Sequence, residues 1–261
     1  MTRFELHGAA FRRSLSAPWT FEGVELSLPP GVYGLFGPNG SGKSTLLECM
    51  AGIQSLGKGT ARFVLEGRTL ADKRFRERLG YVPQQFAFYE EMNAERFLTY
   101  AAGMKLIPAH LVPDRVTEML EQFSLADYRK FRIGALSTGQ RRRLAIAQAM
   151  LNDPHLLLLD EPLEGLDLEE RTNVMERLHE LASYSVIVIA SHILTEIEHW
   201  IERVMFLADG RVEGPKTPQQ WKTSLLHESV RGGAAFPPER EPTLEDVYMS
   251  YIGRRGDRHG T

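Results

Sequence analysis

The chain has 261 residues, of which 43% are hydrophobic, and a formal net charge of −3. This length can bury a large core in one domain or two, and the weakly acidic balance excludes a global basic field that would attract nucleic acid or anionic lipid. Its single cysteine, Cys49, excludes an intrachain disulfide and indicates a reducing, cytoplasmic compartment.

The apolar runs of the chain are short. Examples are 156–159 and 186–190, whereas a membrane-spanning helix needs roughly 18 apolar residues or more. The first residues, Met1 to His7, also lack the apolar core of a signal peptide. We therefore expect neither a membrane span nor a secretory leader.

The first part of the chain predicts two strands followed by a helix. Val24, Leu26 and Leu28 alternate with polar residues, as in a half-buried strand. The apolar run 32–36 predicts a second strand, and residues 44–50 can form a helix. A glycine-rich loop lies between this second strand and the helix.

That loop fits the pattern G-x-x-x-x-G-K-[ST] with the residues Gly37, Pro38, Asn39, Gly40, Ser41, Gly42, Lys43, Ser44 and Thr45. Glycines let the backbone turn tightly, so that successive N–H groups can meet phosphate oxygens. The following helix points its unpaired N–H groups and its positive dipole end at the same anion. We expect Lys43 to reach the β- and γ-phosphates and the Ser44 hydroxyl to hold Mg²⁺, which predicts a nucleoside-triphosphate site.

Strand and helix patterns alternate through much of the remaining chain. Short strands are predicted at 62–65, 79–82, 156–159 and 186–190, and helices at 139–151 and 167–182. The two continuous apolar runs suit strands that are covered on both faces, as in a parallel sheet. The alternation predicts an α/β fold.

Residues 93–136 differ, because they hold helical patterns and no convincing strand. Helices are predicted at 94–104 and 113–123, with a short one near Asp127. We interpret 93–136 as a helical subdomain inserted into the α/β core.

The domain organisation follows from these elements. Residues 1–261 are expected to form a single domain, with the α/β core at 1–92 and 137–230 and a C-terminal loop and helix at 231–261. Within the last segment, 231–242 is rich in Gly and Pro and is predicted as a loop. A final helix is predicted at 243–252, capped by Thr243.

Two carboxylates follow the predicted strand at 156–159. Ligands of an open α/β sheet bind where the strands end, so Asp160 is expected to hold Mg²⁺ and Glu161 to polarise the attacking water. A strand followed by an acidic turn is the alternative interpretation of this segment alone.

Residues Leu136-Ser137-Thr138-Gly139-Gln140 stand at the start of a predicted helix. With them the chain resembles the ATP-binding-cassette (ABC) ATPases, whose signature reads Leu-Ser-Gly-Gly-Gln. Other segments resemble motifs of that family in the same order: the glutamine loop Tyr81-Val82-Pro83-Gln84, the catalytic glutamate and D-loop in Glu161-Pro162 and Gly165-Leu166-Asp167, and the switch histidine in Ala190-Ser191-His192. The resemblance covers nearly the whole chain.

The resemblance implies a P-loop NTPase core with a mainly parallel sheet, flanking helices, an N-terminal antiparallel β region and an inserted helical subdomain. It also implies two cassettes, in a homodimer or with a paired cassette subunit, facing head to tail around two ATP molecules. The implied residues are catalytic Glu161, His192 and Gln84, the Mg²⁺ ligands Ser44, Gln84 and Asp160, the signature residues Ser137, Gly139 and Gln140 for the partner's ATP, and Asp167 of the D-loop.

The sequence offers three candidates for the aromatic residue that stacks on adenine. Phe11 is the candidate, while Trp19 and Phe21 are rivals, and core packing explains each of these aromatics as well.

Two departures from the family pattern are expected to affect how tightly the two cassettes of the dimer pack together. Neither is expected to affect ATP binding. Thr138 replaces the first glycine of the signature and adds β-branched bulk there. Leu163 and Glu164 replace the usual threonine and small residue before the D-loop, and Glu164 is expected near the dimer seam.

A transport cassette with no membrane span implies separate polytopic membrane subunits and a place on the cytoplasmic face of the membrane. The segment 242–248 resembles exporter-type subunits for drugs and antibiotics, so we expect export, with an importer subunit or a soluble ABC ATPase of the iron–sulfur assembly type as alternatives. No nucleic-acid partner is expected.

Several aromatic residues follow the glutamine loop. They suit either a docking groove for a helix of the membrane partner or the core of the helical subdomain: Phe86, Phe88, Tyr89, Phe97 and Tyr100.

Overall fold

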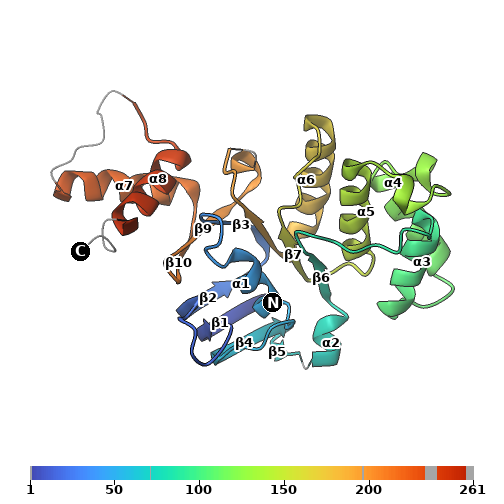
Figure 1. Ribbon diagram of the computed structural model, residues 1–261, viewed down its shortest axis with the longest axis horizontal. Coiled ribbons are helices and arrows are strands. Elements are labelled where there is room, and N and C mark those ends of the chain that lie inside the picture. The colour runs from blue at the N-terminus through green and yellow to red at the C-terminus, as the bar shows by residue number, and fades with distance from the viewer. Residues whose placement is uncertain (1, 71, 196, 233–239, 257–261) are drawn as a thin grey trace.

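A computed structural model describes residues 2–70, 72–195, 197–232 and 240–256 (Figure 1). Its strands form two sheets. The smaller sheet is antiparallel and has the order β2-β1-β4-β5, with β1 at Arg3–Phe11, β2 at Phe21–Leu28, β4 at Lys58–Leu65 and β5 at Arg68–Thr69. The predicted N-terminal antiparallel region is therefore confirmed.

The second sheet has six strands in the order β10-β9-β3-β8-β7-β6. They are β3 Gly31–Phe36, β6 Leu79–Val82, β7 Leu156–Asp160, β8 Val186–Ser191, β9 Arg203–Ala208 and β10 Arg211–Lys216. The strands from β9 to β6 run parallel, and β10 runs antiparallel to β9. Because parallel strands end at the same edge of a sheet, the loops after β3, β6, β7 and β8 are brought together there.

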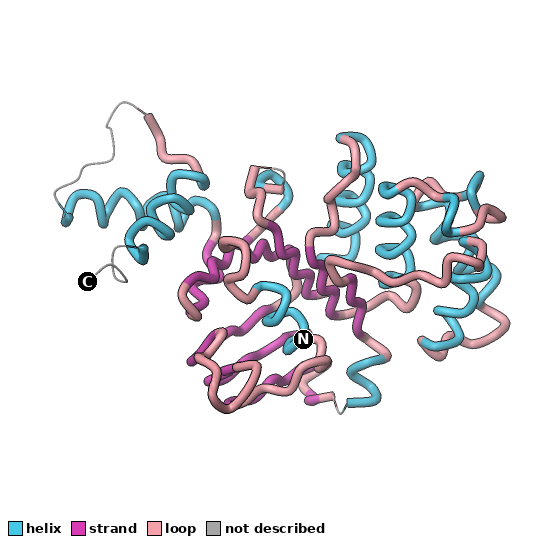
Figure 2. The backbone as a smooth tube through the Cα atoms, in the orientation of Figure 1, coloured by secondary structure: helices cyan, strands magenta, loops and turns pink. Residues whose placement is uncertain are grey.

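Helices pack on both faces of this sheet (Figures 1 and 2). Helix α1 (Lys43–Met50) lies between the two sheets, and its apolar side chains share one core cluster with residues of β1 and β2. Helices α5 (Thr138–Met150) and α6 (Leu168–Ala182) pack on the opposite face in a second cluster. The strands divide their side chains between these two clusters, since alternate residues of a strand point to opposite faces.

The inserted segment precedes α5 and is helical, as predicted. It contains α3 (Ala94–Met104), α4 (Val112–Gln122) and two short 3₁₀ turns at Ala126–Tyr128 and Ile133–Ala135. It lies at the side of the molecule opposite the C-terminal helices (Figure 1). The helical content arises from amphipathic patterns and from the cap on α3, where the Asn93 side chain accepts a hydrogen bond from the Arg96 N–H.

Helices α7 (Pro218–Gly232) and α8 (Leu244–Gly256) complete the chain. Aromatic rings hold them on β9: the Phe206 ring lies 4.7 Å from that of Trp221 and 5.2 Å from that of Tyr251. Thr243 caps α8 as predicted, because its hydroxyl accepts the Asp246 N–H. Two small elements remain, α2 at Asp72–Arg76 and a 3₁₀ turn at Glu198–Trp200.

Several elements differ from the sequence-based expectation. Strand β1, the strand pair β9 and β10, and helix α7 were not predicted. Of the predicted loop at 231–242, residues 231 and 232 belong to α7 instead, and 233–239 lies outside the described residues. The last helix runs on to Gly256 rather than ending at Ile252.

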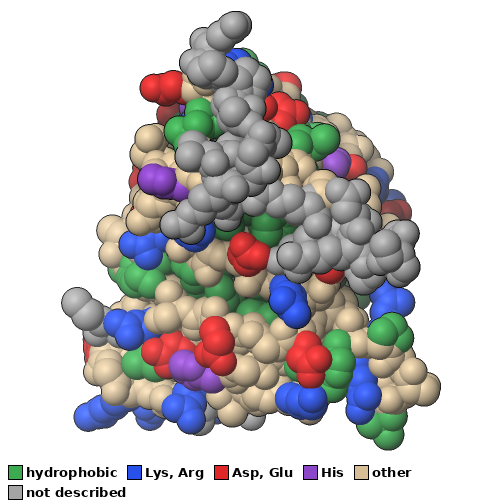
Figure 3. All heavy atoms as spheres, turned by 90° about the vertical axis from the view of Figure 1, so that its left-hand side faces the viewer, with side chains coloured by type: hydrophobic (Ala, Val, Ile, Leu, Met, Phe, Trp, Pro, Cys, Tyr) green, Lys and Arg blue, Asp and Glu red, His purple; other side chains and the backbone are tan. Residues whose placement is uncertain are grey.

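Charged side chains of both signs are interspersed on the face shown in Figure 3. This distribution agrees with the net charge of −3. Within the described residues, no helix combines the length and the apolarity needed to cross a bilayer.

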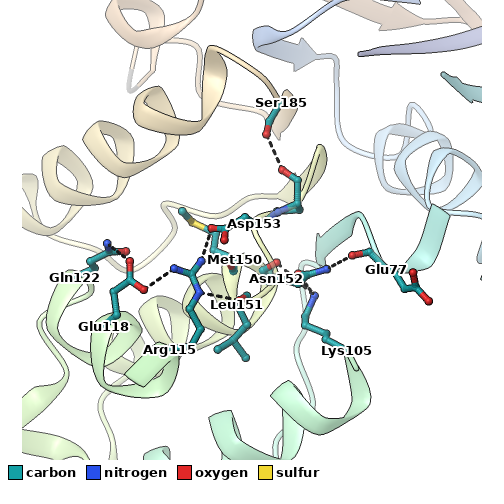
Figure 4. Close-up of polar contacts among 12 residues, drawn as sticks. Glu77, Lys105, Arg115, Glu118, Gln122, Met150, Leu151, Asn152, Asp153 and Ser185 are labelled. Carbon is teal, nitrogen blue, oxygen red and sulfur yellow. Dashed lines mark hydrogen bonds and ion pairs between the residues drawn. The ribbon is translucent and has the colours of Figure 1, made fainter. Parts of the chain in front are cut away.

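A polar network fastens the helical segment to the core at the C-terminal end of α5 (Figure 4). The Lys105 ammonium donates to the Asn152 side-chain oxygen at 2.8 Å, and the Asn152 amide donates to the Glu77 carbonyl at 2.6 Å. Arg115 donates from Nε to the Leu151 carbonyl at 2.8 Å. The Lys105 ammonium also donates to the Ala149 carbonyl at 3.4 Å, so both cations meet the backbone at the C-terminal end of α5, where the helix dipole is negative.

Burial lowers the pKa of Lys105 to about 8 from 10.5. The unfolded state therefore binds more protons than the folded state between these pH values, and the free energy of unfolding should rise as the pH is raised from 8 to 10.5, by up to about 3 kcal/mol. Chemical denaturation at several pH values measures this slope. Lys105→Met should flatten it, whereas Lys73→Met, at an exposed lysine of α2, should leave it unchanged; equal slopes in wild type and Lys105→Met would contradict the assignment.

Candidate nucleotide site

A cavity of about 620 Å³ opens at the edge of the six-stranded sheet where the parallel strands end. The β1–β2 loop, the loop between β3 and α1, the C-terminal ends of β6 and β7 and the turn between β9 and β10 contribute to it. The lining residues are Arg13, Pro18, Trp19, Thr20, Pro38, Asn39, Gly40, Ser41, Gly42, Lys43, Ser44, Thr45, Gln84, Asp160, Glu161, Asp209 and Gly210. All of the predicted phosphate loop except Gly37 therefore lies on this cavity, together with the glutamine loop and both carboxylates.

The phosphate loop connects β3 to α1 and has a backbone that only glycine adopts readily. Gly40 and Gly42 have φ values of 77° and 103°, and a Cβ at Gly42 would lie 2.7 Å from a methyl carbon of Thr20. Gly42 stands at the N-cap of α1, so no side chain caps the helix there. The first turn of α1 lines the cavity and gives it a positive dipole end, which suits an anion.

Lys43 folds back over this loop. Its ammonium donates to the carbonyl of Gly37 at 2.7 Å and to that of Pro38 at 3.2 Å, and the residue is 7% exposed. Burial lowers the pKa of Lys43, while the nearby carboxylates of Glu161 and Asp160 oppose the shift. The lysine is thus a cation held inside the cavity by backbone oxygens that a phosphate could replace.

Asp160, the last residue of β7, is buried beside the start of α1. Burial raises the pKa of Asp160, a hydrogen bond from the Ser44 side chain lowers it, and the Glu161 carboxylate raises it further. Ser44, Asp160 and Gln84 all line the cavity and offer hydroxyl, carboxylate and amide oxygens. Mg²⁺ prefers oxygen ligands and is bound with one or two carboxylates plus substrate phosphates, so this donor set fits the ion.

Glu161 follows directly and occupies a strained backbone conformation with φ of 50°. Its N–H donates to the Ala190 carbonyl of β8 at 2.9 Å, which fixes the turn against the neighbouring strand. His192 Nδ1 lies 2.8 Å from Glu161 Oε1. The structure therefore brings the predicted catalytic carboxylate and the switch histidine into direct contact, although they are far apart in sequence.

The signature residues lie outside this cavity. Ser137 and Gln140 cap α5 reciprocally: the Gln140 N–H donates to the Ser137 hydroxyl at 3.1 Å, and the Ser137 N–H donates to the Gln140 side chain at 2.9 Å. A Cβ at Gly139 would lie 3.2 Å from the Gly165 carbonyl, so the signature packs closely on the D-loop of its own chain. Asp167 of that loop caps α6 by accepting the Glu170 N–H at 2.8 Å.

Thr138 and Glu164, the two departures from the family pattern, both make contacts within the chain. A Cβ at Gly165 would lie 3.2 Å from the Thr138 methyl carbon, which places that methyl group over the D-loop. Glu164 lies 3.6 Å from the Arg142 guanidinium.

The aromatic at the cavity is Trp19 and not Phe11. Phe11 is absent from the lining and stacks instead on the fully buried Phe21, with ring centroids 6.1 Å apart. Trp19 lines the cavity, and its ring carries the Arg12 guanidinium at 4.5 Å and the Lys58 ammonium at 4.6 Å. The sequence could not rank these aromatics, because the choice depends on how the β1–β2 loop folds over the cavity.

Sequence reasoning missed further lining residues, namely Arg13, Pro18, Thr20, Asp209 and Gly210. The Asp-Gly pair carried a usable signal, since this dipeptide is typical of a tight hairpin turn. It joins β9 and β10, whose pairing had not been predicted. Arg13 and Thr20 carried no signal, because the β1–β2 loop has no motif.

The sequence profile described as ABC transporter matches residues 21–164 of the chain. The chain is 35% identical over 201 residues to the uncharacterized ABC transporter ATP-binding protein YxlF of Bacillus subtilis, which covers 76% of this chain and 66% of that protein. It is 34% identical over 265 residues to the molybdenum import ATP-binding protein ModC of Rhodopseudomonas palustris, covering 98% of this chain and 68% of that one. These curated relatives are longer than the matched region, and the chain spans 51% to 68% of their length.

Solved structures have the same fold. An ATP-binding subunit of an ABC transporter superposes with a TM-score of 0.79 at 25% identity and covers 95% of this chain and 99% of that one. The dimeric cassette MJ0796 bound to ADP and Pi gives a TM-score of 0.70 at 24% identity, covering 82% and 99%. The predicted P-loop NTPase cassette fold is thereby confirmed.

The cavity geometry predicts that Trp19→Ala weakens ATP binding more than Phe11→Ala, because stacking of a base on an aromatic ring contributes about 1–3 kcal/mol. Titration with a fluorescent ATP analogue measures both affinities. Lys43→Ala, which removes the cation from the phosphate loop, should abolish binding and serves as the reference for a lost site. If Phe11→Ala is folded and loses more ATP affinity than Trp19→Ala, then Phe11 is the residue that stacks on adenine.

Proposed function

We propose, since this chain belongs to the ABC transporter family, that it dimerises around two ATP molecules and hydrolyses them to drive transport through separate membrane subunits. The cassette itself is an ABC-type ATPase domain. The observation that carries the proposal is the meeting of Lys43, Asp160 and Glu161 at one cavity, with His192 behind Glu161 in contact with its carboxylate.

The chemistry would be divided among these side chains. The phosphate loop and Lys43 hold the β- and γ-phosphates and neutralise charge that develops during phosphoryl transfer. Ser44, Asp160 and Gln84 would hold Mg²⁺, which would supply further positive charge to the triphosphate. Glu161 orients and polarises the attacking water, and His192 holds the Glu161 carboxylate by the 2.8 Å contact.

A second copy would complete each site. Ser137, Gly139 and Gln140 do not line the cavity of their own chain, and their helix α5 begins at this motif. A helix N-terminus attracts anions. We infer that this N-terminus meets the ATP of a partner cassette, in a homodimer or in a pair with a related subunit.

The direction of transport is the weakest part of the sequence-based expectation. Export rested on the short segment 242–248, whereas the named relatives include molybdenum, methionine and sulfate/thiosulfate import ATP-binding proteins. An importer subunit is therefore a second candidate function that these relatives favour. A cytoplasmic-face location is proposed for either direction.

The membrane partner is proposed to dock beside the glutamine loop. A groove of about 440 Å³ is lined there by Phe86, Phe88, Leu136, Ser137, Thr138, Arg141, Arg142 and Ala145. Phe88 packs into the subdomain core, with its ring 5.3 Å from that of Phe97. Tyr89 and Tyr100 are 55% and 43% exposed and pair with each other at 5.6 Å, so they offer apolar surface next to the groove.

Glu161→Gln should retain ATP binding and lower the hydrolysis rate by about 10² to 10⁴ because it removes the general base. Phosphate release measures the rate, and size-exclusion chromatography with ATP and Mg²⁺ should show an accumulated dimer. Glu176→Gln, at an exposed acid of α6, is the matched control and should behave as wild type. A wild-type hydrolysis rate in Glu161→Gln would show that Glu161 is not the general base.

Replacing Tyr89 and Tyr100 together with Ser should reduce recovery of a polytopic membrane protein from detergent-solubilised membranes. ATP binding and the melting temperature of the isolated subunit should stay near wild type, since both side chains are exposed. Met249→Ser, at an exposed residue of α8, is the control. Undiminished recovery by the double variant would argue against docking here.

A further inference from the structure

Arg142 joins two loops that belong to the nucleotide site. It lies in the second turn of α5, and its Nη1 donates to the Gln84 carbonyl at 3.2 Å. Its Nη2 lies 3.6 Å from Oε2 of Glu164. Gln84 follows β6 and lines the cavity, whereas Glu164 ends the short segment that follows Glu161 after β7.

The two partners of this ion pair differ in burial. The Arg142 side chain is 11% exposed and that of Glu164 is 61% exposed. A cation that is largely withdrawn from water needs oxygen partners, and the Gln84 carbonyl and the Glu164 carboxylate provide them. Because the Glu164 carboxylate remains exposed to solvent, the ion pair contributes little to the free energy of unfolding. Its effect is therefore on the positions of the two loops that it joins.

Glu164 is connected to the catalytic carboxylate by a single turn. The Glu164 N–H points at the Glu161 carbonyl at 3.4 Å, and Leu163 between them is buried in the core. At the start of the turn, Glu161 has a φ of 50° and contacts His192. A displacement of Glu164 should therefore also displace the Glu161 backbone, because the turn between them is hydrogen-bonded and Leu163 is held in the core.

We propose that Glu164 is a positioning residue for ATP hydrolysis, which ties the Glu161 turn through Arg142 to the backbone of the glutamine loop. A movement of the Gln84 loop then changes the orientation of Glu161. The inference rests on the proposed hydrolytic function and goes beyond it, since Glu164 itself does not line the nucleotide cavity.

The variants Glu164→Gln, Arg142→Gln and the double variant test this coupling. Each single change should lower kcat about 3- to 30-fold, as expected for loss of coupling between linked sites, while the Kd for ATP and the melting temperature stay near wild type. The double variant should be no slower than Arg142→Gln alone, because both changes break one connection. Glu164→Asp, which keeps the charge, should recover part of the rate.

A matched control is available in α4. Glu118 pairs with Arg115 in the same manner, at 2.6 Å and with side chains 46% and 16% exposed, but far from the cavity. Glu118→Gln should leave kcat unchanged. It thus separates the loss of a generic ion pair from the loss of this connection.

A probe on the glutamine loop gives a readout that does not depend on turnover. Gln85→Cys places a thiol at an exposed position, whereas the native Cys49 is buried and burial raises the pKa of its thiol to about 12, so labelling is selective. ATP should change the emission of an environment-sensitive label there. The amplitude should fall when Glu164→Gln or Arg142→Gln is added and persist when Glu118→Gln is added.

The outcomes separate this inference from the proposed function. Wild-type kcat in Glu164→Gln, or rate losses that multiply in the double variant, would overturn the positioning role while leaving the ATPase intact. A lowered melting temperature with a parallel loss of ATP binding would also overturn it, because Glu164 would then be structural. If the wild-type protein hydrolyses no ATP, the proposed function fails and the inference fails with it.

Discussion

The site depends on one geometric constraint: the parallel strands β3, β6, β7 and β8 all end at the same edge of the sheet. Each strand delivers one functional loop there, and the ladders between them fix the relative register of those loops. The hydrogen bond from the Glu161 N–H to the Ala190 carbonyl extends this register past the end of β7. Residues that are distant in sequence can then meet at hydrogen-bond distance, because the strand register fixes the positions of the loops that carry them.

The same edge concentrates buried charge. Burial lowers the pKa of Lys43 and raises that of Asp160, so each group alone would be pushed toward its neutral form. They counteract this effect in each other, and the Ser44 hydroxyl adds a further hydrogen bond to the Asp160 carboxylate. A triphosphate with a divalent cation would bring charges of both signs into this cavity, where Lys43 and Asp160 already offer partners of opposite charge.

The sequence predicted those features that local chemistry determines. The phosphate loop requires glycines at fixed positions, and the fully apolar strands β7 and β8 could be identified from their composition alone. It could not rank Trp19 above Phe11, because the two lie on either side of a loop whose path is set by tertiary packing. Strand β10 was missed for a similar reason, since it is a polar edge strand that pairs with β9. Strand β9 was overlooked, because its apolar run 204–208 carries the same signal as β8.

The departures from the family pattern acquire a different meaning in three dimensions. From the sequence, Thr138 and Glu164 were expected to affect the seam between two cassettes. In the folded chain the Thr138 methyl group lies over Gly165, and Glu164 faces Arg142, so both first act between loops of one subunit. Each joins α5 to the segment that follows β7, which carries Glu161. Because α5 also presents the signature at its N-terminus, these two contacts connect that N-terminus to the segment that carries Glu161. In the proposed dimer, Thr138 and Glu164 would therefore lie between the partner's ATP and the carboxylate of their own site.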